Sequence, residues 1–279
     1  MPSQKQSKRR RHDAVAPART KTQVRVPSPP KPADSGRRAS PKVLLIAGGA
    51  ALAVIVGVVL AVTLSGGGSS SSANVPAVGS LSGALPGAAD VNRLFKGIPQ
   101  DGNTLGSPSA PVTLVEYVDL QCPYCRDFET TVFPSIVKSY VRTGKLKVDQ
   151  RILAFLGPDS VSGRNAALAA GLQGKQFDYS ELLYFNQGTE NTGWLDQSMI
   201  DKTAASIPGL QVPMLLSSAK TGAVEVKANA VDAQAKADNV SSTPTLLVGR
   251  TGSTPKEVAL TSPSDVRTLK AAIQEALAG

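Results

Sequence analysis

The chain has 279 residues, 41% of them hydrophobic, and carries a formal net charge of +9. Residues 1–42 contain 12 of the 30 Lys and Arg residues and two acidic ones, whereas the remainder has 18 basic and 19 acidic residues. The basic segment has no aromatic residue for base stacking and the rest of the chain is nearly neutral, so we expect no nucleic-acid partner.

The first 64 residues have the pattern of a membrane anchor. Residues 1–42 are basic and rich in proline and are expected to be a disordered tail. Val43 to Leu64 is an uncharged apolar run that would span about 33 Å as a helix, enough to cross a bilayer once. Because the basic residues precede this run, the positive-inside rule places the N-terminus in the cytoplasm and the rest of the chain outside the cell membrane.

A cleaved signal peptide is the alternative for this segment. An uncleaved anchor is favoured because the basic region and the apolar run are both longer than those of an ordinary signal peptide. From Ser65 the chain reads SGGGSSSSA and continues in small residues, so residues 65–89 are predicted to be a flexible tether. Residues 90–279 are long enough for one domain with a substantial core.

The predicted domain starts with the pattern of a βαβ unit. Val112 to Leu120 is rich in β-branched and apolar residues, which predicts a central strand buried on both faces. Apolar residues at helical spacing predict a helix over Arg126 to Arg142, which Pro134 should kink or interrupt. Lys145 to Phe155 is predicted to be a second strand that pairs in parallel with the first.

A helical insertion is expected at about residues 158–239. Helical patterns occur there over Val161 to Gln173, Phe177 to Phe185, Gln197 to Ile207, and a long polar stretch that ends near Asp238. After it, Thr245 to Val248 is predicted to be a short strand, Glu257 to Leu260 its partner, and Pro263 to Leu277 an amphipathic helix. The predicted order is therefore β-α-β, helices, β-β-α.

The two cysteines of the chain, Cys122 and Cys125, flank Pro123 and Tyr124 between the predicted strand and helix. A thiol at a helix start meets unpaired N–H groups and the positive end of the helix dipole, which favour the thiolate. We therefore expect Cys122 to be the nucleophile that forms mixed disulfides. Cys125, one helical turn further on, is placed to attack that bond and release the substrate. The spacing predicts a redox-active dithiol.

A metal site and a structural disulfide are the alternatives for this pair. Zinc and iron–sulfur sites ordinarily need four protein ligands, whereas this chain has two Cys and a single His, His12, which lies in the basic tail. Metal binding would need carboxylates or a second chain. A disulfide between residues three apart closes a very small loop and removes little chain entropy. We therefore expect neither a metal nor an organic cofactor.

Three segments carry a resemblance to a known family: GIPQDGNTLGSPSAPVTLVEYVDLQCPYC, NQGTENTGWL in the helical insertion, and VSSTPTLLV near the end. Over roughly residues 97–279 the chain resembles the DsbA-type thiol:disulfide oxidoreductases of the thioredoxin-like superfamily, particularly the membrane-anchored bacterial proteins. The resemblance implies an α/β thioredoxin-like fold with an inserted helical subdomain and a cis peptide bond before Pro244. The tail, the anchor and the tether lie outside it.

The resemblance also implies which residues surround the dithiol. In the family, the loop that matches Thr243 and Pro244 lies against the dithiol, and the backbone of the residue before the proline pairs with an extended substrate segment. From the residues alone, an ordinary turn before a strand explains the same pair. Pro123 and Tyr124 are expected to tune the redox potential, because they shape the first helical turn and the hydrogen bonds to the Cys122 sulfur.

Glu116 is the candidate proton acceptor, and the matching position in the family carries an acid. It lies on an apolar predicted strand, where an unpaired carboxyl has a raised pKa, and Cys125 needs a nearby base because it attacks only as a thiolate. Asp119 is the rival acid. Strand alternation puts it on the opposite face, so a capping or solvent-facing carboxylate is preferred there. Trp194 is expected to be a packing or surface-groove residue.

These features predict an enzyme: an extracytoplasmic thiol:disulfide oxidoreductase that oxidises cysteine pairs in exported proteins, because disulfides persist outside the cytoplasm. By resemblance, its redox partner would be a membrane oxidase of the DsbB or vitamin K epoxide reductase type. A reductase or isomerase on the same scaffold is the alternative, since the Pro-Tyr dipeptide resembles that of glutaredoxins as much as that of strong oxidases. A tethered, non-enzymatic binding module is the alternative of another class.

Overall fold

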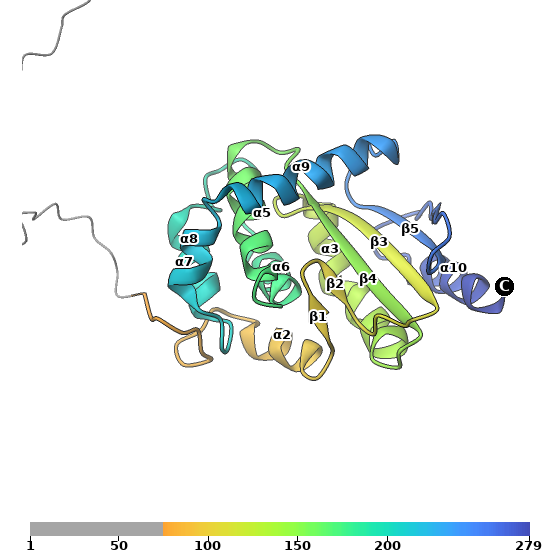
Figure 1. Cartoon of the computed structure of the whole chain (residues 1–279), viewed down its shortest axis with the longest axis horizontal. Coiled ribbons are helices and arrows are strands. Elements are labelled where there is room, and N and C mark those ends of the chain that lie inside the picture. The colour runs from red at the N-terminus through yellow and green to blue at the C-terminus, as the bar shows by residue number, and fades with distance from the viewer. Residues whose placement is uncertain (1–74) are drawn as a thin grey trace, which may run out of the picture. The chain divides into compact units, whose positions relative to one another are not determined.

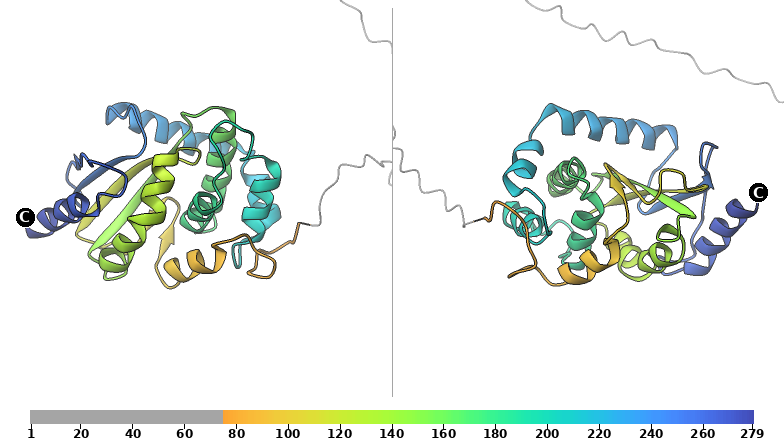
Figure 2. Two further views of the ribbon diagram at one scale, coloured as in Figure 1. Left: turned by 180° about the vertical axis from the view of Figure 1, so that it is seen from behind. Right: turned by 60° about the horizontal axis from the view of Figure 1, so that its bottom comes forward.

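The computed structural model of the protein describes residues 75–279 and has a six-stranded sheet at its centre. Helices cover both faces of the sheet, and further helices extend beyond its β1 edge (Figure 1, Figure 2). In spatial order the strands are β1 (Gln100–Asp101), β2 (Thr104–Leu105), β4 (Leu146–Leu153), β3 (Val112–Asp119), β5 (Thr245–Arg250) and β6 (Lys256–Glu257).

The predicted βαβ unit is confirmed. β3 and β4 pair in parallel, from Val112 opposite Leu146 to Asp119 opposite Leu153. β5 pairs with the other side of β3 in antiparallel orientation, so that Tyr117 lies opposite Thr245. β3 is therefore the central strand, and all of its residues except Thr113 are buried, as expected for a strand covered on both faces. The C-terminal end of β3 and the start of β5 consequently meet at one edge of the sheet.

The helix predicted over Arg126 to Arg142 is interrupted. The chain forms α3 (Pro123–Thr131), α4 (Phe133–Ile136) and a π-helical turn, η1 (Val137–Val141), with the break at Val132. Pro134 has no N–H to donate to the preceding turn, and its ring crowds that turn. The predicted interruption is confirmed, and the helix also starts earlier than expected, because Cys122 caps it.

The helical insertion is confirmed as five helices: α5 (Pro158–Gly171), α6 (Gln176–Phe185), α7 (Gln197–Ala205), α8 (Val212–Ser218) and α9 (Gly222–Ala237). α9 leaves this group and crosses back over the sheet, where it packs against α5 and β4 (Figure 1, Figure 2). The C-terminal helix, α10 (Val266–Ala278), packs against β5. β6 is shorter than its predicted range, although the backbone N–H of Val258 still donates to the Leu246 carbonyl at 2.8 Å.

The side chains of β3 alternate between two apolar clusters. Leu114 and Val118 belong to the large core that includes α3 and α6, whereas Val115 and Tyr117 pack with Leu247 and with residues of α9 and its end. An alternating strand places residue 116 on the side of α3 and α6. The acid at this position is therefore directed into the large core rather than toward α9.

Residues 75–95 differ from the expectation of a tether that reaches residue 89. The backbone N–H of Gly79 donates to the Leu210 carbonyl at 2.8 Å, and Val78 forms a bridge with Gln211. α2 (Ala88–Phe95) follows and buries Val91 and Phe95 in the core. The composition of this segment did not predict the helix, because most of the residues before it are small.

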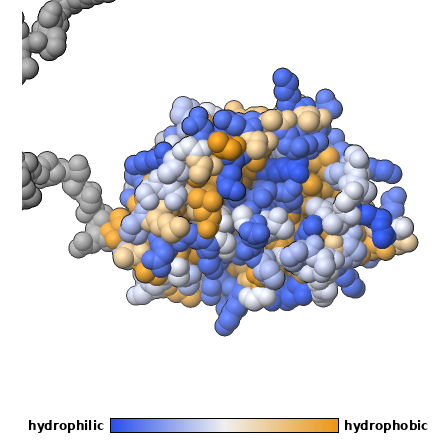
Figure 3. Space-filling model, in the orientation of Figure 1, coloured by the Kyte–Doolittle hydropathy of each residue, from blue (hydrophilic) through white to orange (hydrophobic). Residues whose placement is uncertain are grey.

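The segments assigned to the tail, residues 1–42, and to the membrane anchor, Val43 to Leu64, lie outside the described residues. Within residues 75–279, no helix is both long enough and apolar enough to span a bilayer. Hydrophilic residues predominate on the face seen in Figure 3, where hydrophobic residues form small separate groups.

Candidate active site

The structure places the two cysteines at the start of α3, directly after the central strand. Cys122 is the N-cap of α3, and its sulfur accepts a hydrogen bond from the backbone N–H of Cys125 at 3.4 Å. Both residues are free thiols; Cys122 is 5% exposed and Cys125 is fully buried. This asymmetry leaves one sulfur accessible to a second molecule and hides the other behind it.

The environment of Cys122 stabilises its thiolate. A hydrogen bond from the Cys125 thiol is the largest cause that lowers the pKa of Cys122, to about 6, and contacts with Thr243 and the backbone N–H groups of Cys125 and Tyr124 add to it. Burial opposes this shift. These N–H groups are free to bind the sulfur because the N–H groups in the first turn of a helix have no acceptor within the helix.

Cys125 has the opposite character. Burial is the main cause that raises the pKa of Cys125 well above its usual value, and the neighbouring Cys122 raises it further. A thiol with a high pKa holds its proton at neutral pH, so Cys125 needs a base before it can attack a disulfide. The pair therefore consists of a thiolate that is almost buried and a protonated thiol that is fully buried.

Thr243 and Pro244 lie beside the dithiol. The Cys122 sulfur is 3.3 Å from the carbonyl oxygen of Thr243, and the Thr243–Pro244 bond is cis, the isomer implied by the resemblance. These two residues and Tyr124 line a cavity of about 420 Å³ that extends along residues 257–263. Tyr124 is 62% exposed, so an apolar ring borders the accessible sulfur.

Glu116 is fully buried on β3, facing the large core. Its Oε1 accepts a hydrogen bond from the side-chain amide of Gln150 at 3.0 Å, and Gln150 in turn accepts one from Gln176. Burial raises the pKa of Glu116 to about 8, against which the Gln150 hydrogen bond acts. A carboxyl that titrates near neutral pH suits the proton-accepting role predicted for this residue.

Two further buried acids, which the sequence analysis did not identify, share this region. Glu129 lies one helical turn after Cys125 on α3, and Glu181 lies on α6. Burial, followed by the negative charge at Glu116, raises the pKa of both residues well above the usual range. Each acid occupies a position on the apolar face of its helix. An acid at such a core position is the sequence signal that could have identified both residues.

Asp119 is a buried structural carboxylate. It accepts hydrogen bonds from the backbone N–H groups of Gln121, Phe155 and Leu156 at 2.9, 2.7 and 3.1 Å, and from the Ser160 hydroxyl at 2.7 Å. Both the capping and the solvent-facing interpretations are wrong, because the N-caps of α3 and α5 are Cys122 and Gly157 and Asp119 has no exposed surface. Its role is to tie the start of the dithiol loop to the loop that precedes α5.

The segment NQGTENTGWL supports the same loop from the other side. The side-chain amide of Gln187 donates to the Leu120 carbonyl at 2.8 Å and to the Cys122 carbonyl at 3.1 Å. The backbone N–H of Asn191 donates to the side-chain oxygen of Gln121 at 3.1 Å. Trp194 packs against the core, as expected. These bracing amides were not predicted, since no spacing rule marks them.

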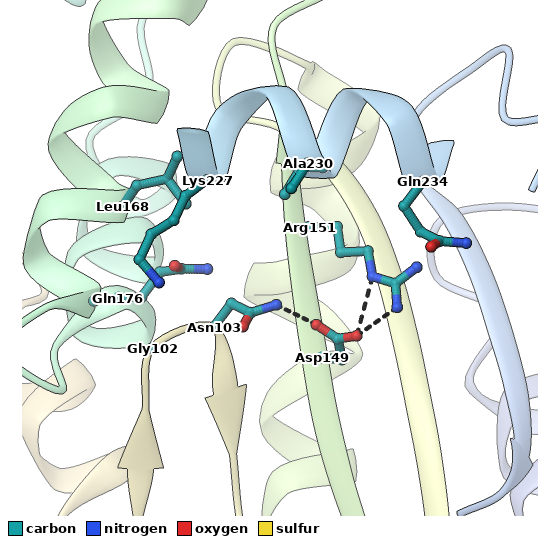
Figure 4. Close-up of a pocket in the computed structure, with 11 residues that line it drawn as sticks. Gly102, Asn103, Asp149, Arg151, Leu168, Gln176, Lys227, Ala230 and Gln234 are labelled. Carbon is teal, nitrogen blue, oxygen red and sulfur yellow. Dashed lines mark hydrogen bonds and ion pairs between the residues drawn. The ribbon is translucent and has the colours of Figure 1, made fainter. Parts of the chain in front are cut away.

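Another cavity, of about 290 Å³, lies between α9 and the β1–β2 hairpin (Figure 4). Asp149 accepts hydrogen bonds there from Asn103 and from the Arg151 guanidinium at 2.7 Å, and Lys227 of α9 also lines the cavity (Figure 4). Its lining contains none of the predicted site residues. Among residues 75–279, no group of His, Cys, Asp or Glu side chains is arranged to hold a metal ion.

Comparison with known proteins agrees with this geometry. The family model described as Thioredoxin matches residues 100–275. Disulfide bond formation protein D of Bacillus subtilis is 30% identical over 151 residues, which cover 52% of this chain and 66% of that protein. Probable disulfide bond formation protein D of Bacillus cereus is 31% identical over 99 residues, 35% of this chain and 46% of that protein. The matched region is thus about half to two thirds of these relatives' lengths.

Solved structures show the same fold. Oxidised BdbD from Bacillus subtilis superposes with a TM-score of 0.57 at 22% identity, over 65% of this chain and 98% of that one. The alpha-DsbA1 protein of Wolbachia pipientis gives a TM-score of 0.55 at 20% identity, over 67% and 96% of the two chains. The family match, which spans more than half of the chain, is the stronger finding. The chain belongs to the thioredoxin family.

Proposed function

We propose that this protein is an extracytoplasmic thiol:disulfide oxidoreductase that oxidises cysteine pairs in exported proteins. The observation that carries the proposal is the state of Cys122, which lies at the start of α3 with its pKa lowered to about 6. A thiol with a low pKa is a good leaving group, so Cys122 is readily displaced from a mixed disulfide when a second substrate thiolate attacks and the substrate disulfide forms. That property favours oxidation of the substrate over reduction.

The proposed reaction proceeds in two exchanges. A substrate thiolate attacks the Cys122 sulfur of the Cys122–Cys125 disulfide, and the Cys125 sulfur leaves with the electron pair of the broken bond and takes up a proton. The second substrate thiolate then attacks the substrate sulfur of the mixed disulfide, and Cys122 leaves as a thiolate. The substrate gains one disulfide, and the protein keeps two electrons as its dithiol.

The surroundings of the dithiol support binding of an extended substrate. The Thr243 carbonyl beside the Cys122 sulfur is placed to accept a backbone N–H of a bound segment. The cavity along Tyr124 and Pro244 offers room for side chains next to the reacting cysteine. Pro123 and Tyr124 are proposed to tune the redox potential through the first turn of α3, and Glu116 to exchange the proton of Cys125.

The proposed location is the outer face of the cell membrane. The uncharged run Val43 to Leu64 supports a single-pass anchor, the basic residues 1–42 support a cytoplasmic N-terminus, and residues 65–74 remain the proposed tether. Reoxidation of the dithiol requires a partner that accepts two electrons, and we propose a membrane oxidase of the DsbB or vitamin K epoxide reductase type.

A redox titration of the full chain against glutathione buffers tests the direction. A potential well above that of thioredoxin, about −270 mV, is expected for an oxidase. A potential at the thioredoxin value would instead favour an envelope reductase or isomerase. If the wild type neither oxidises nor reduces a substrate protein and the Cys122→Ser variant behaves in the same way, both enzymatic proposals are contradicted and a binding module is favoured, so this variant is assayed in parallel with the wild type.

A further inference from the structure

Three glutamates from three different elements lie in the core behind the dithiol. Glu116 of β3 and Glu129 of α3 have no exposed surface, and Glu181 of α6 is 2% exposed. Among the described residues, none of the three forms an ion pair within 4.0 Å, and both oxygens of Glu129 and one of each of the others lack a hydrogen-bond partner. Glu116 accepts a hydrogen bond from the neutral amide of Gln150.

Such a cluster cannot hold three negative charges. Taking an unpaired carboxylate out of water is costly, and each additional charge repels the others, so the group holds protons instead. The described residues offer no metal site that would change this balance. The pKa values follow the same direction, since burial raises those of Glu129 and Glu181 well above the usual range and Asp149 adds a small increase at Glu116. The carboxyls of this cluster therefore keep protons bound at neutral pH.

The cluster is connected to the dithiol through the contact between α3 and α6. Cys125 and Glu129 are four residues apart on α3 and share the same face, and Glu181 and Tyr184 share a face of α6. Burial raises the pKa of Tyr184, and the charges at Cys125 and Glu129 raise it further. The helices that carry these groups, α3 and α6, pack against each other. This hydroxyl also donates to the Asp119 carbonyl at 3.3 Å.

The other end of the cluster reaches the protein surface. Glu181 lines a cavity of about 600 Å³ between α2, α4, η1 and α6. Besides Glu181, its wall carries four basic residues and one acid: Arg93, Lys96, Lys138, Arg142 and Asp90. This cavity shares no lining residue with the one beside Tyr124 and Thr243. Protons therefore have an opening to solvent that a substrate bound at Cys122 does not cover.

We propose that Glu129 and Glu181 form a proton path that links Cys125 and Glu116 to the cavity between α2 and α6. The inference rests on the proposed oxidoreductase function. When a substrate opens the disulfide, the Cys125 sulfur leaves with the bonding electron pair and takes a proton from the cluster, which is refilled from the cavity. When Cys125 later displaces the reoxidising partner's thiolate from Cys122, it returns that proton to the cluster.

The test measures closure of the mixed disulfide between Cys122 and glutathione, prepared by treating the reduced full chain with oxidised glutathione. Closure requires Cys125 to lose its proton and is followed as release of glutathione across the pH range. We expect Glu129→Gln and Glu181→Gln to slow closure about tenfold near neutral pH and to change its pH profile. The preceding attack by Cys122 should stay within about twofold of wild type, because it uses no cluster proton.

Matched controls separate proton transfer from packing. Glu225→Gln, on the exposed side of α9, makes the same chemical change away from the cluster and should close at the wild-type rate. Glu181→Asp retains a carboxyl and should recover most of the rate, whereas a purely structural role would make the shorter side chain worse than Gln. Because Gln is a neutral isostere of a protonated Glu, both Gln variants should fold.

Wild-type closure rates and an unchanged pH profile in both Gln variants would overturn the proton path while leaving the oxidoreductase function intact. Infrared difference spectra between the oxidised and reduced chains supply an independent readout. We expect the carbonyl bands of protonated carboxyls to change on reduction, and Glu181→Gln to alter those bands. Identical bands in the wild type and this variant would also contradict the path.

Discussion

The Cys122 sulfur lies 3.3 Å from the carbonyl oxygen of Thr243, a residue 121 positions further along the chain. The contact exists because β3 and β5 are antiparallel neighbours, so that the end of one strand lies beside the start of the other. It combines an accessible nucleophile with a backbone acceptor for a peptide. The relationship explains how a single face of the molecule can both hold an unfolded segment and exchange disulfides with it.

The first prediction concerns the thiolate. In the reduced full chain Cys122 should titrate near pH 6, followed by the ultraviolet absorbance of the thiolate. Cys125→Ala should raise the pKa of Cys122, because the thiol hydrogen bond from Cys125 is the largest cause of its depression. Cys122→Ser should remove the transition altogether. A wild-type transition near the ordinary thiol pKa of about 8.5 would contradict the activated-thiolate argument.

The stability of the reduced protein should depend on the same group. A depressed pKa in the folded state stabilises the fold above the unfolded pKa, and this stabilisation is lost as pH falls through the folded value of about 6. We expect wild type to gain about 1–3 kcal/mol over Cys122→Ser between pH 5 and 9, measured by urea denaturation of reduced protein. Equal pH dependence in the two proteins would show that the thiolate is not stabilised.

Glu116 should have the opposite effect on stability. Its pKa is raised to about 8 in the folded protein from an ordinary 4.5, so wild type loses stability as pH rises between these values. Glu116→Gln removes this loss and should stabilise the fold at pH 7 by about 1–3 kcal/mol, with little effect at acidic pH. Glu225→Gln, on the exposed side of α9, serves as the control. A destabilised Glu116→Gln variant at pH 7 would mean that the carboxyl is ionised and paired.

Asp119 should prove structural. Asp119→Ala removes an acceptor shared by three backbone N–H groups and the Ser160 hydroxyl. Leaving those buried donors unpaired should cost about 3–5 kcal/mol in the free energy of unfolding. Because Asp119 lies on the other side of β3 from Glu116, closure of the mixed disulfide in the folded fraction should keep its wild-type pH profile. If the pH profile of closure changed as expected for the Glu129→Gln and Glu181→Gln variants, Asp119 would instead take part in proton transfer.

Local sequence determined the secondary structure of the domain to a large extent. The apolar run Val112 to Leu120 defines β3 to within one residue, because a strand buried on both faces is apolar at most positions. Lys145 to Phe155 defines β4 to within two residues, because its apolar and polar side chains alternate. Pro134 marked the interruption after α3 for a steric reason that needs no tertiary contact. The two-residue strands β1 and β2 escaped prediction, since hairpins this short carry no periodicity.

The sequence by itself also determined the chemical pair, since Cys122 and Cys125 depend only on a spacing and on the start of a helix. Their surroundings were decided by tertiary structure. Glu116, Glu129 and Glu181 come from a strand and two helices, and burial at the place where these elements meet, a property of the packed core, is what raises their pKa values. The motif determines that the sulfurs of Cys122 and Cys125 react, whereas proton transfer and substrate binding depend on the side chains and backbone that the fold places around these sulfurs.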